Sequence, residues 1–226
     1  MFIPLRDENP TRRLPVLTVA LIALNCGVFL FQAFSPRGLE YYVLRMGAIP
    51  YEISHFAPLV HYPVDRIAPA LALVVSMFLH GSLFHLGGNM LYLWIFGNNV
   101  EDLLGPVRFV FFYLVTGIAA GLTHVLFNPS STAPMIGASG AVAGVLGAYF
   151  LLWPGARVLT LVFFVWVVPI PAAIVLGLWF VMQILNIGLG GGVAWFAHVG
   201  GFLAGMALIA VMAGRRVRRP HHPPSS

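Results

Sequence analysis

The sequence predicts an all-α, polytopic membrane protein with six transmembrane helices. Of its 226 residues, 59% are hydrophobic and only 8% are charged, and the mean hydropathy is +0.90. Soluble domains carry about a quarter charged residues, so this composition is typical of a protein built for lipid. No Asp, Glu, Lys or Arg occurs in four long blocks, which cover residues 14–36, 67–100, 109–156 and 158–214.

Turn signals divide these blocks into segments near the length of about 20 residues that spans a bilayer. The expected spans are Pro15–Phe34, a second segment that ends near Gly97, Phe109–Phe127, Gly137–Trp153, Pro171–Asn186 and Val193–Ala213. The first is too long for a signal peptide and lacks a small-residue cleavage site. Pro169 and Pro171 divide the stretch 157–186, so we interpret Val158–Val168 as an apolar, interfacial connection.

The arginines set the predicted orientation, because cytoplasmic loops carry an excess of basic residues. With six spans and both termini inside, nine of the twelve arginines are cytoplasmic, and three lie in the large outer loop, about 35–79. We therefore expect a cell inner-membrane protein with a cytoplasmic tail over 1–14, a membrane domain over 15–213, and a disordered, basic, Pro-rich tail over 214–226. The formal charge of +5 follows this topology and does not indicate nucleic acid.

Polar side chains from three expected spans share one depth near the outer face. Ser139 begins the fourth span and His198 lies in the first turns of the sixth, while His80, His85 and Asn89 lie at the outer end of the second. Polar groups inside a span are costly, so each is a functional candidate.

These residue types together suit acyl transfer. Ser139 is a weak nucleophile that needs a base, and a neutral His198 imidazole could supply it. His85 and Asn89 are four residues apart on one helical face, where both can donate to a developing oxyanion. The Ser139 N–H, unpartnered at a helix start, could add a third donor, and Gly137 allows close approach of backbone and substrate.

Small residues explain how the spans could approach. The fourth span carries Gly140, Ala143, Gly144 and Gly147, and the sixth carries Gly201 and Gly205. Small residues at this spacing let membrane helices pack backbone to backbone.

Each feature also has a plainer interpretation. The glycines alone indicate helix packing, and His198 alone could be a buried histidine bonded to a carbonyl. A metal site at His80, His85 and Asn89 would lack any carboxylate or cysteine at that depth. A proton-coupled transporter would more often show an internal repeat and buried carboxylates.

Four motifs taken together resemble the rhomboid family of intramembrane serine proteases. They are HGSLFHLGGN (80–89), GNNVEDLLGPVRFVFFYL (97–114), GASG (137–140) and AHVGG (197–201). The resemblance covers about residues 15–213 and implies a six-helix rhomboid-like bundle without metal or cofactor. It also implies an endopeptidase that cleaves transmembrane segments of partner proteins in the bilayer.

The resemblance implies a role for each matching residue. Ser139 would be the nucleophile and His198 the base, and His85, Asn89 and Gly137 would form the oxyanion and substrate site. The supporting residues would be His80, which would hydrogen-bond in the outer loop, Glu101, which would bond backbone near the inner turn, and Gly201, which would pack the sixth span on the fourth.

The sequence departs from the family pattern at two places. Some members carry an aromatic residue four after the serine, where this chain has Ala143, so contacts from the second or fifth span would have to hold the His198 ring. Many members carry a Trp-Arg pair in the first outer loop, and no such pair is found here.

Two further expectations follow for substrate access. The run Gly188–Gly192 suits a flexible cap over the site, and a substrate would enter sideways between the second and fifth spans.

The rival hypothesis is a rhomboid-like protein that binds transmembrane clients without cleaving them, which would usually lack the serine or the histidine. The sequence names neither the substrate nor the oligomeric state.

Overall fold

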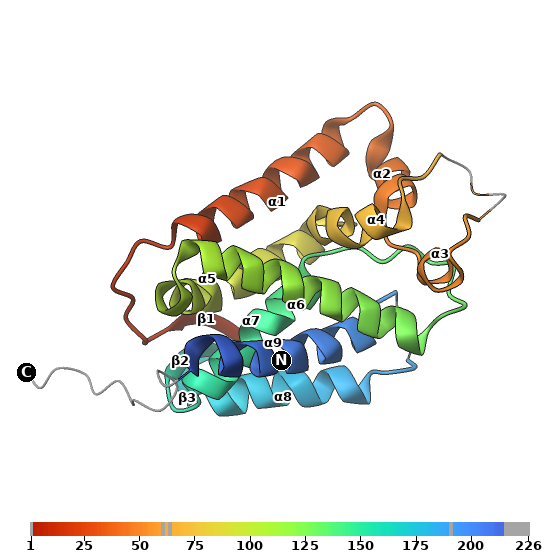
Figure 1. Cartoon of the computed structure of the whole chain (residues 1–226). Helices are drawn as coiled ribbons and strands as arrows, with labels where there is room; N and C mark the ends of the chain where they lie inside the picture. Colours follow the sequence, from red (N-terminus) through yellow and green to blue (C-terminus); the bar gives the residue numbers. More distant parts are fainter. Residues whose placement is uncertain (1, 60–61, 63–64, 190–191, 215–226) are drawn as a thin grey trace, which may run out of the picture.

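The computed structural model describes residues 2–59, 62, 65–189 and 192–214. Helices run lengthwise beside one another, with a small sheet at one end and short helices at the other (Figure 1). We call these the sheet end and the loop end. The predicted tail over 214–226 lies outside the described residues except for Gly214, and so does part of the predicted glycine cap, residues 190 and 191.

The expected spans reappear as helices with similar bounds. They are α1 (Val16–Phe34), α5 (Leu83–Leu104), α6 (Pro106–Phe127), α7 (Ser139–Leu152), α8 (Ala172–Leu185) and α9 (Trp195–Ala213). Among the described helices, α1, α6 and α9 are long and apolar enough to cross a bilayer, and α7 and α8 are apolar but shorter. The polytopic helical membrane fold is therefore confirmed, whereas the number of six spans stays a prediction.

Helix α5 extends seven residues beyond Gly97, where the second span was expected to end. The polar residues after Gly97 find partners in the N-terminal segment, and Asn99 Nδ2 donates to the Asn9 carbonyl at 2.9 Å. Gly105 then ends the helix with φ +79°, a conformation that glycine adopts without strain, and Pro106 begins α6.

The sheet was not predicted, so the expectation of purely helical structure is wrong in this region. Strands β1 (Phe2–Asp7), β2 (Arg157–Val162) and β3 (Trp166–Pro171) form an antiparallel sheet in that order. The interfacial connection is thus largely a β-hairpin, and the expected tail over 1–14 contains its third strand. Proline occurs on the two edge strands, where a missing N–H is tolerated.

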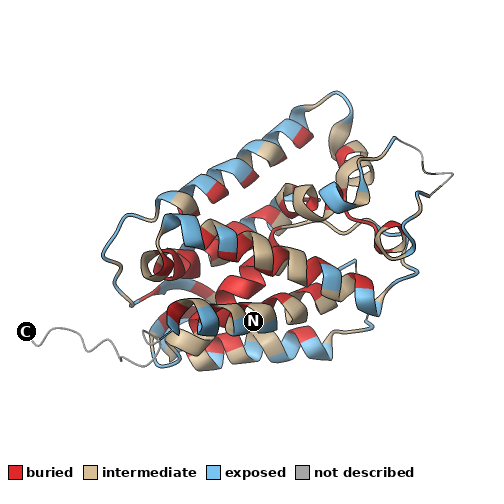
Figure 2. Ribbon diagram, in the orientation of Figure 1, coloured by how far each residue is buried: buried red, intermediate tan, exposed pale blue. Residues whose placement is uncertain are grey.

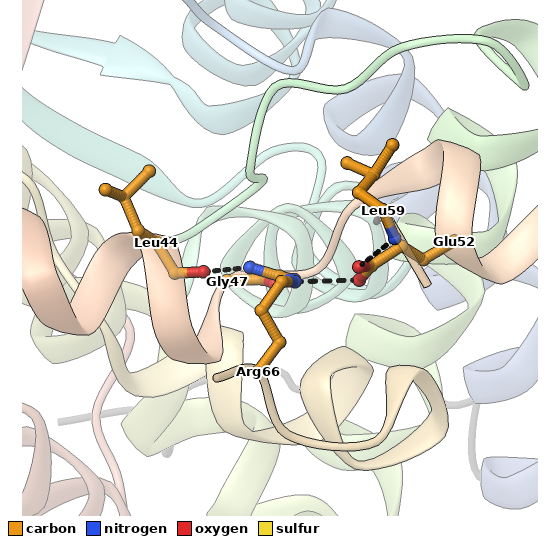
Figure 3. A network of polar contacts seen from close by, with 5 residues as sticks. All are labelled: Leu44, Gly47, Glu52, Leu59 and Arg66. Carbon is orange, nitrogen blue, oxygen red and sulfur yellow. Dashed lines mark hydrogen bonds and ion pairs between the residues drawn. The ribbon is translucent and has the colours of Figure 1, made fainter. Parts of the chain in front are cut away.

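The loop after α1 is largely helical and is tied together by one arginine. It contains α2 (Gly38–Met46), α3 (Pro50–His55), α4 (Pro69–Val75) and the 3₁₀ turn η1 (Ser76–Phe78). Buried Arg66 pairs with Glu52 at 2.8 Å and donates to the carbonyls of Leu44 and Gly47 (Figure 3). A buried ion pair with added hydrogen bonds specifies one loop geometry.

Helix α7 is the centre of the core, and it is buried along most of its length (Figure 2). Glycines set its distance from α9: a Cβ on Gly201 would collide with the Gly140 carbonyl, and one on Gly205 with the Gly144 carbonyl. This backbone contact brings the first turns of α7 and α9 together.

Candidate active site

Ser139 and His198 meet where α7 and α9 begin. Ser139 is the first residue of α7, and His198 lies in the first turn of α9. The Ser139 Oγ and the His198 Nε2 lie 2.8 Å apart, within hydrogen-bond distance. This is the arrangement in which an imidazole can accept the hydroxyl proton.

The His198 ring is held by α8 and by the start of α9. Its Nδ1 lies 2.7 Å from the Gln183 Oε1. The Trp179 ring packs against it at a centroid distance of 5.9 Å, and the Trp195 ring contacts it edge-on at 6.0 Å. The Gln183 and Trp179 contacts come from the fifth expected span, one of the two anticipated, whereas the Trp195 contact comes from the sixth.

His85 and Asn89 lie on the first turns of α5 and face the same space. The Asn89 Nδ2 donates to the His85 carbonyl at 3.0 Å, and the Ser82 Oγ caps the helix by accepting from the His85 N–H at 3.1 Å. Among the described residues, the His85 ring has no hydrogen-bond partner, so its N–H is available to a ligand.

Gly137 keeps this space open. Its φ is +113°, which residues with a side chain rarely adopt. A Cβ at this position would stand 2.6 Å from the His85 Nε2 and 3.7 Å from the Ser139 Oγ. The space between the Ser139 Oγ and the His85 Nε2 is therefore open because residue 137 is glycine.

The three supporting residues lie in different surroundings. Glu101 is at the sheet end, where it accepts hydrogen bonds from the first turn of α1, and Gly201 packs on Gly140. His80 is fully buried against the His85 ring, with a centroid distance of 5.1 Å. Neither His80 ring nitrogen has a protein partner among the described residues, so the expected side-chain bond in the outer loop is not observed there.

A cavity of about 670 Å³ joins these groups. It is lined from α5 by Phe84, His85, Gly88, Asn89 and Tyr92, from α7 by Ser139, Val142 and Leu146, from α8 by Trp179 and Gln183, and from α9 by His198. Helices α5 and α8 form two of its walls and make few direct contacts with one another. Within the described residues, no group of three or more His, Cys, Asp or Glu could hold a metal ion.

Gln183 and Trp179 are the residues of this site that the sequence analysis missed. Both were placed in the fifth span, and Gln183 is a polar amide inside an otherwise apolar helix. The rule that singled out His198 applies equally to an amide in a membrane helix. That signal was present in the sequence but was not followed.

Comparison with known proteins identifies the family. The family model for the Rhomboid domain matches residues 69–215, which include both members of the Ser139–His198 pair. The chain belongs to the rhomboid family. Its similarity to curated rhomboid proteins is spread over several lineages.

Three relatives illustrate this spread. Rhomboid protein 1, mitochondrial, of Saccharomyces cerevisiae is 33% identical over 63% of this chain and 42% of its own length. RHOMBOID-like protein 1 of Arabidopsis thaliana is 29% identical over 86% of this chain and 52% of its own length. Rhomboid protease GluP of Bacillus subtilis is 41% identical over 34% of this chain and 14% of its own length. The chain spans about half or less of the length of these rhomboid relatives.

Proposed function

We propose that this rhomboid protein is an intramembrane serine endopeptidase that cleaves peptide bonds in or beside the transmembrane segments of other membrane proteins. The observation that carries the proposal is the 2.8 Å contact between the Ser139 Oγ and the His198 Nε2 at one wall of the cavity that His85 and Asn89 also line. The relative GluP of Bacillus subtilis is named a rhomboid protease, which supports the proposal.

In the proposed reaction, Ser139 attacks the substrate carbonyl while His198 takes the hydroxyl proton. His198 then returns this proton to the leaving amine, and a water activated by the same ring releases the acyl group. The charge on the carbonyl oxygen would be stabilised by the side chains of His85 and Asn89 and by the N–H of Ser139. Gly137 would leave room for the substrate backbone.

The gap between α5 and α8 is the proposed route for a substrate helix. Their exposed side chains are apolar, including Phe84, Leu178 and Met182, so a transmembrane segment can approach through lipid without desolvating charges. We further propose that the protein lies in the cell's inner membrane with both termini in the cytoplasm, as its arginine distribution predicts.

The experiment measures cleavage of single-span fusion proteins with different transmembrane segments, reconstituted with the enzyme in liposomes. Ser139→Ala and His198→Ala are expected to lower the rate by roughly 10⁴-fold or more. The first variant lacks the nucleophile, and the second lacks the base that activates it. Ser130→Ala is the matched control, since it removes a hydroxyl from the exposed loop before α7, and its rate should equal wild type.

Two results would contradict the proposal. Cleavage by Ser139→Ala at the wild-type rate would exclude this serine as the nucleophile. If the wild type bound the fusion proteins, as detected by crosslinking, but cleaved none of them, the client-binding alternative would replace the protease.

A further inference from the structure

The inference concerns Gln183, the polar amide of α8, and rests on the proposed function. Apart from Gln183, helix α8 consists of apolar residues over Ala172–Leu185, yet the Gln183 side chain is buried, with 6% of its surface exposed. An amide buried in such surroundings is destabilising unless its donors and acceptor find partners. Both ends of this amide do.

The partners determine which end of the amide faces the histidine. The Gln183 Nε2 donates to the Trp179 carbonyl at 2.9 Å, and a carbonyl oxygen can only accept. Reversing the amide would set two oxygens against each other at that distance. The hydrogen-bond network therefore assigns the Oε1 to the side of His198.

The orientation of the Gln183 amide determines which imidazole nitrogen of His198 carries the proton. The Gln183 Oε1 can only accept, so the His198 Nδ1, 2.7 Å away, must carry the hydrogen. In a neutral imidazole the Nε2 then has the free lone pair. That nitrogen is the one 2.8 Å from the Ser139 Oγ, so the serine hydroxyl donates to it.

We propose that Gln183 is the positioning residue of the Ser139–His198 pair: it holds the His198 ring in the tautomer and orientation that accept the serine proton. The chain of donors runs from Ser139 through His198 to Gln183, and ends at the backbone of Trp179. When His198 becomes positively charged during the reaction, the Nδ1–H still donates to the same oxygen. The bond thus persists through proton transfer without rearrangement, and it needs no buried carboxylate.

The position of Gln183 on α8 has a consequence for substrate access. The aromatic residue of other family members would stand on the same helix as the serine, whereas Gln183 stands on a wall of the proposed route. Because Gln183 lies on α8 and His198 on α9, a displacement of α8 that widens this route would stretch the bond to His198. The His198 ring would then be aligned with Ser139 only while α8 keeps the position that it has in this structure.

The experiment compares three variants in the full chain. Gln183→Met keeps the length of the side chain but removes the acceptor. Gln183→Glu, in its protonated form, keeps an acceptor for His198 and an O–H that can donate to the Trp179 carbonyl. Asn186→Leu removes a half-buried amide at the end of α8 as a control. The readouts are kcat and KM on the single-span fusion proteins, the rate at which a fluorophosphonate labels Ser139, thermal stability, and the tautomer of ¹⁵N-labelled His198 by solid-state NMR.

For Gln183→Met we expect kcat and the labelling rate to fall together by about 10- to 100-fold, with KM within about two-fold of wild type. Wild-type His198 should carry its proton on Nδ1, whereas Gln183→Met should show a mixture of tautomers. Gln183→Glu should restore most of the rate, and Asn186→Leu should match wild type.

Two outcomes would overturn the inference. One is a Gln183→Met protein with wild-type kcat and the wild-type tautomer. The other is a loss of activity that tracks a loss of stability and is not restored by Gln183→Glu, because that pattern belongs to a residue with only a structural role. The NMR readout needs no protease activity, so failure of the proposed function would leave the assignment of the tautomer testable on its own.

Discussion

The two ends of α5 carry polar side chains that differ in their hydrogen-bond partners. At the sheet end, both oxygens of Glu101 are occupied: Oε1 accepts from the Leu17 N–H at 2.9 Å, and Oε2 accepts from the N–H and the hydroxyl of Thr18, each at 2.7 Å. At the loop end, the His85 ring lines the cavity. Among the described residues, this ring has no hydrogen-bond partner. One helix therefore holds a fully satisfied group and an unsatisfied one.

The satisfied end acts as a helix cap supplied from outside the helix. Pro15 precedes α1 and offers it no side-chain cap, so the first N–H groups of α1 need another acceptor. The Glu101 carboxylate provides it and places a negative charge at the positive end of the helix dipole. It thereby joins the end of α5 to the beginning of α1.

The difference indicates which polar groups stabilise the fold and which are kept free for a ligand. A buried polar group with all its partners contributes to folding, whereas a group that faces a cavity without partners has hydrogen-bonding capacity left for a substrate. Substitutions at the two ends of α5 should therefore separate activity from stability.

The largest effect is expected at the loop end. Asn89→Ala and His85→Ala should each lower the cleavage rate by about 10²- to 10³-fold, the usual effect of removing one oxyanion donor. Their thermal unfolding should stay close to wild type. Trp94→Phe, an exposed position on the same helix, serves as the control. Equal losses of rate and stability in Asn89→Ala would instead assign this side chain to the fold.

A smaller effect is expected at the sheet end, and it falls on stability. Glu101→Gln turns an NH₂ group toward N–H donors, which should lower the free energy of unfolding by about 2 to 3 kcal/mol. Cleavage by the folded fraction at low temperature should remain near wild type. Asp102→Asn tests the half-buried neighbour that accepts from the Arg12 N–H and should change stability by less than about 1 kcal/mol. An inactive but fully stable Glu101→Gln protein would contradict the contrast between the two ends.

The smallest effect is a pH dependence at Asp7 in β1. Burial raises the pKa of this carboxyl, although a hydrogen bond from the Tyr149 hydroxyl at 2.8 Å opposes the shift. The folded state then binds the proton more tightly than the unfolded state, so the contribution of Asp7 to stability decreases as the pH rises from about 3.8 through the raised pKa. Asp7→Asn lacks this decrease.

Thermal unfolding of wild type and Asp7→Asn at a series of pH values measures this effect. Relative to wild type, the variant should become more stable between acidic and neutral pH. A difference that stayed constant would show that folding leaves the Asp7 pKa unchanged, and a change in the opposite direction would show that ionised Asp7 is favoured in the folded protein.

The sequence predicted the helical spans because charged residues and turn signals delimit the apolar blocks closely. The predicted topology placed Ser139 and His198 at the same depth in the membrane. The small residues around Gly140 and Gly201 indicated how their two helices could approach each other. These features depend on local composition and on the bilayer as a fixed reference.

Features that depend on distant pairing were not predicted. Strand β1 pairs with β2, which lies about 150 residues later in the chain, and no periodicity in either segment identifies the partner. The Arg66 cluster likewise depends on the fold of its loop, because two of its acceptors are backbone carbonyls. Gln183 could have been singled out as an amide in an apolar helix, but its partner could not be named before α8 was placed beside α9.

Covalent labelling is the direct test of whether Ser139 is a nucleophile that His198 activates. Purified protein is treated with a fluorophosphonate, and the modified residue is mapped by mass spectrometry in wild type, Ser139→Ala, His198→Ala and Ser130→Ala. A Ser139 nucleophile activated by His198 should give one adduct on Ser139 in wild type and Ser130→Ala, and none in the other two variants. Equal labelling of Ser139 in His198→Ala, or no adduct on Ser139 in the wild type, would contradict it.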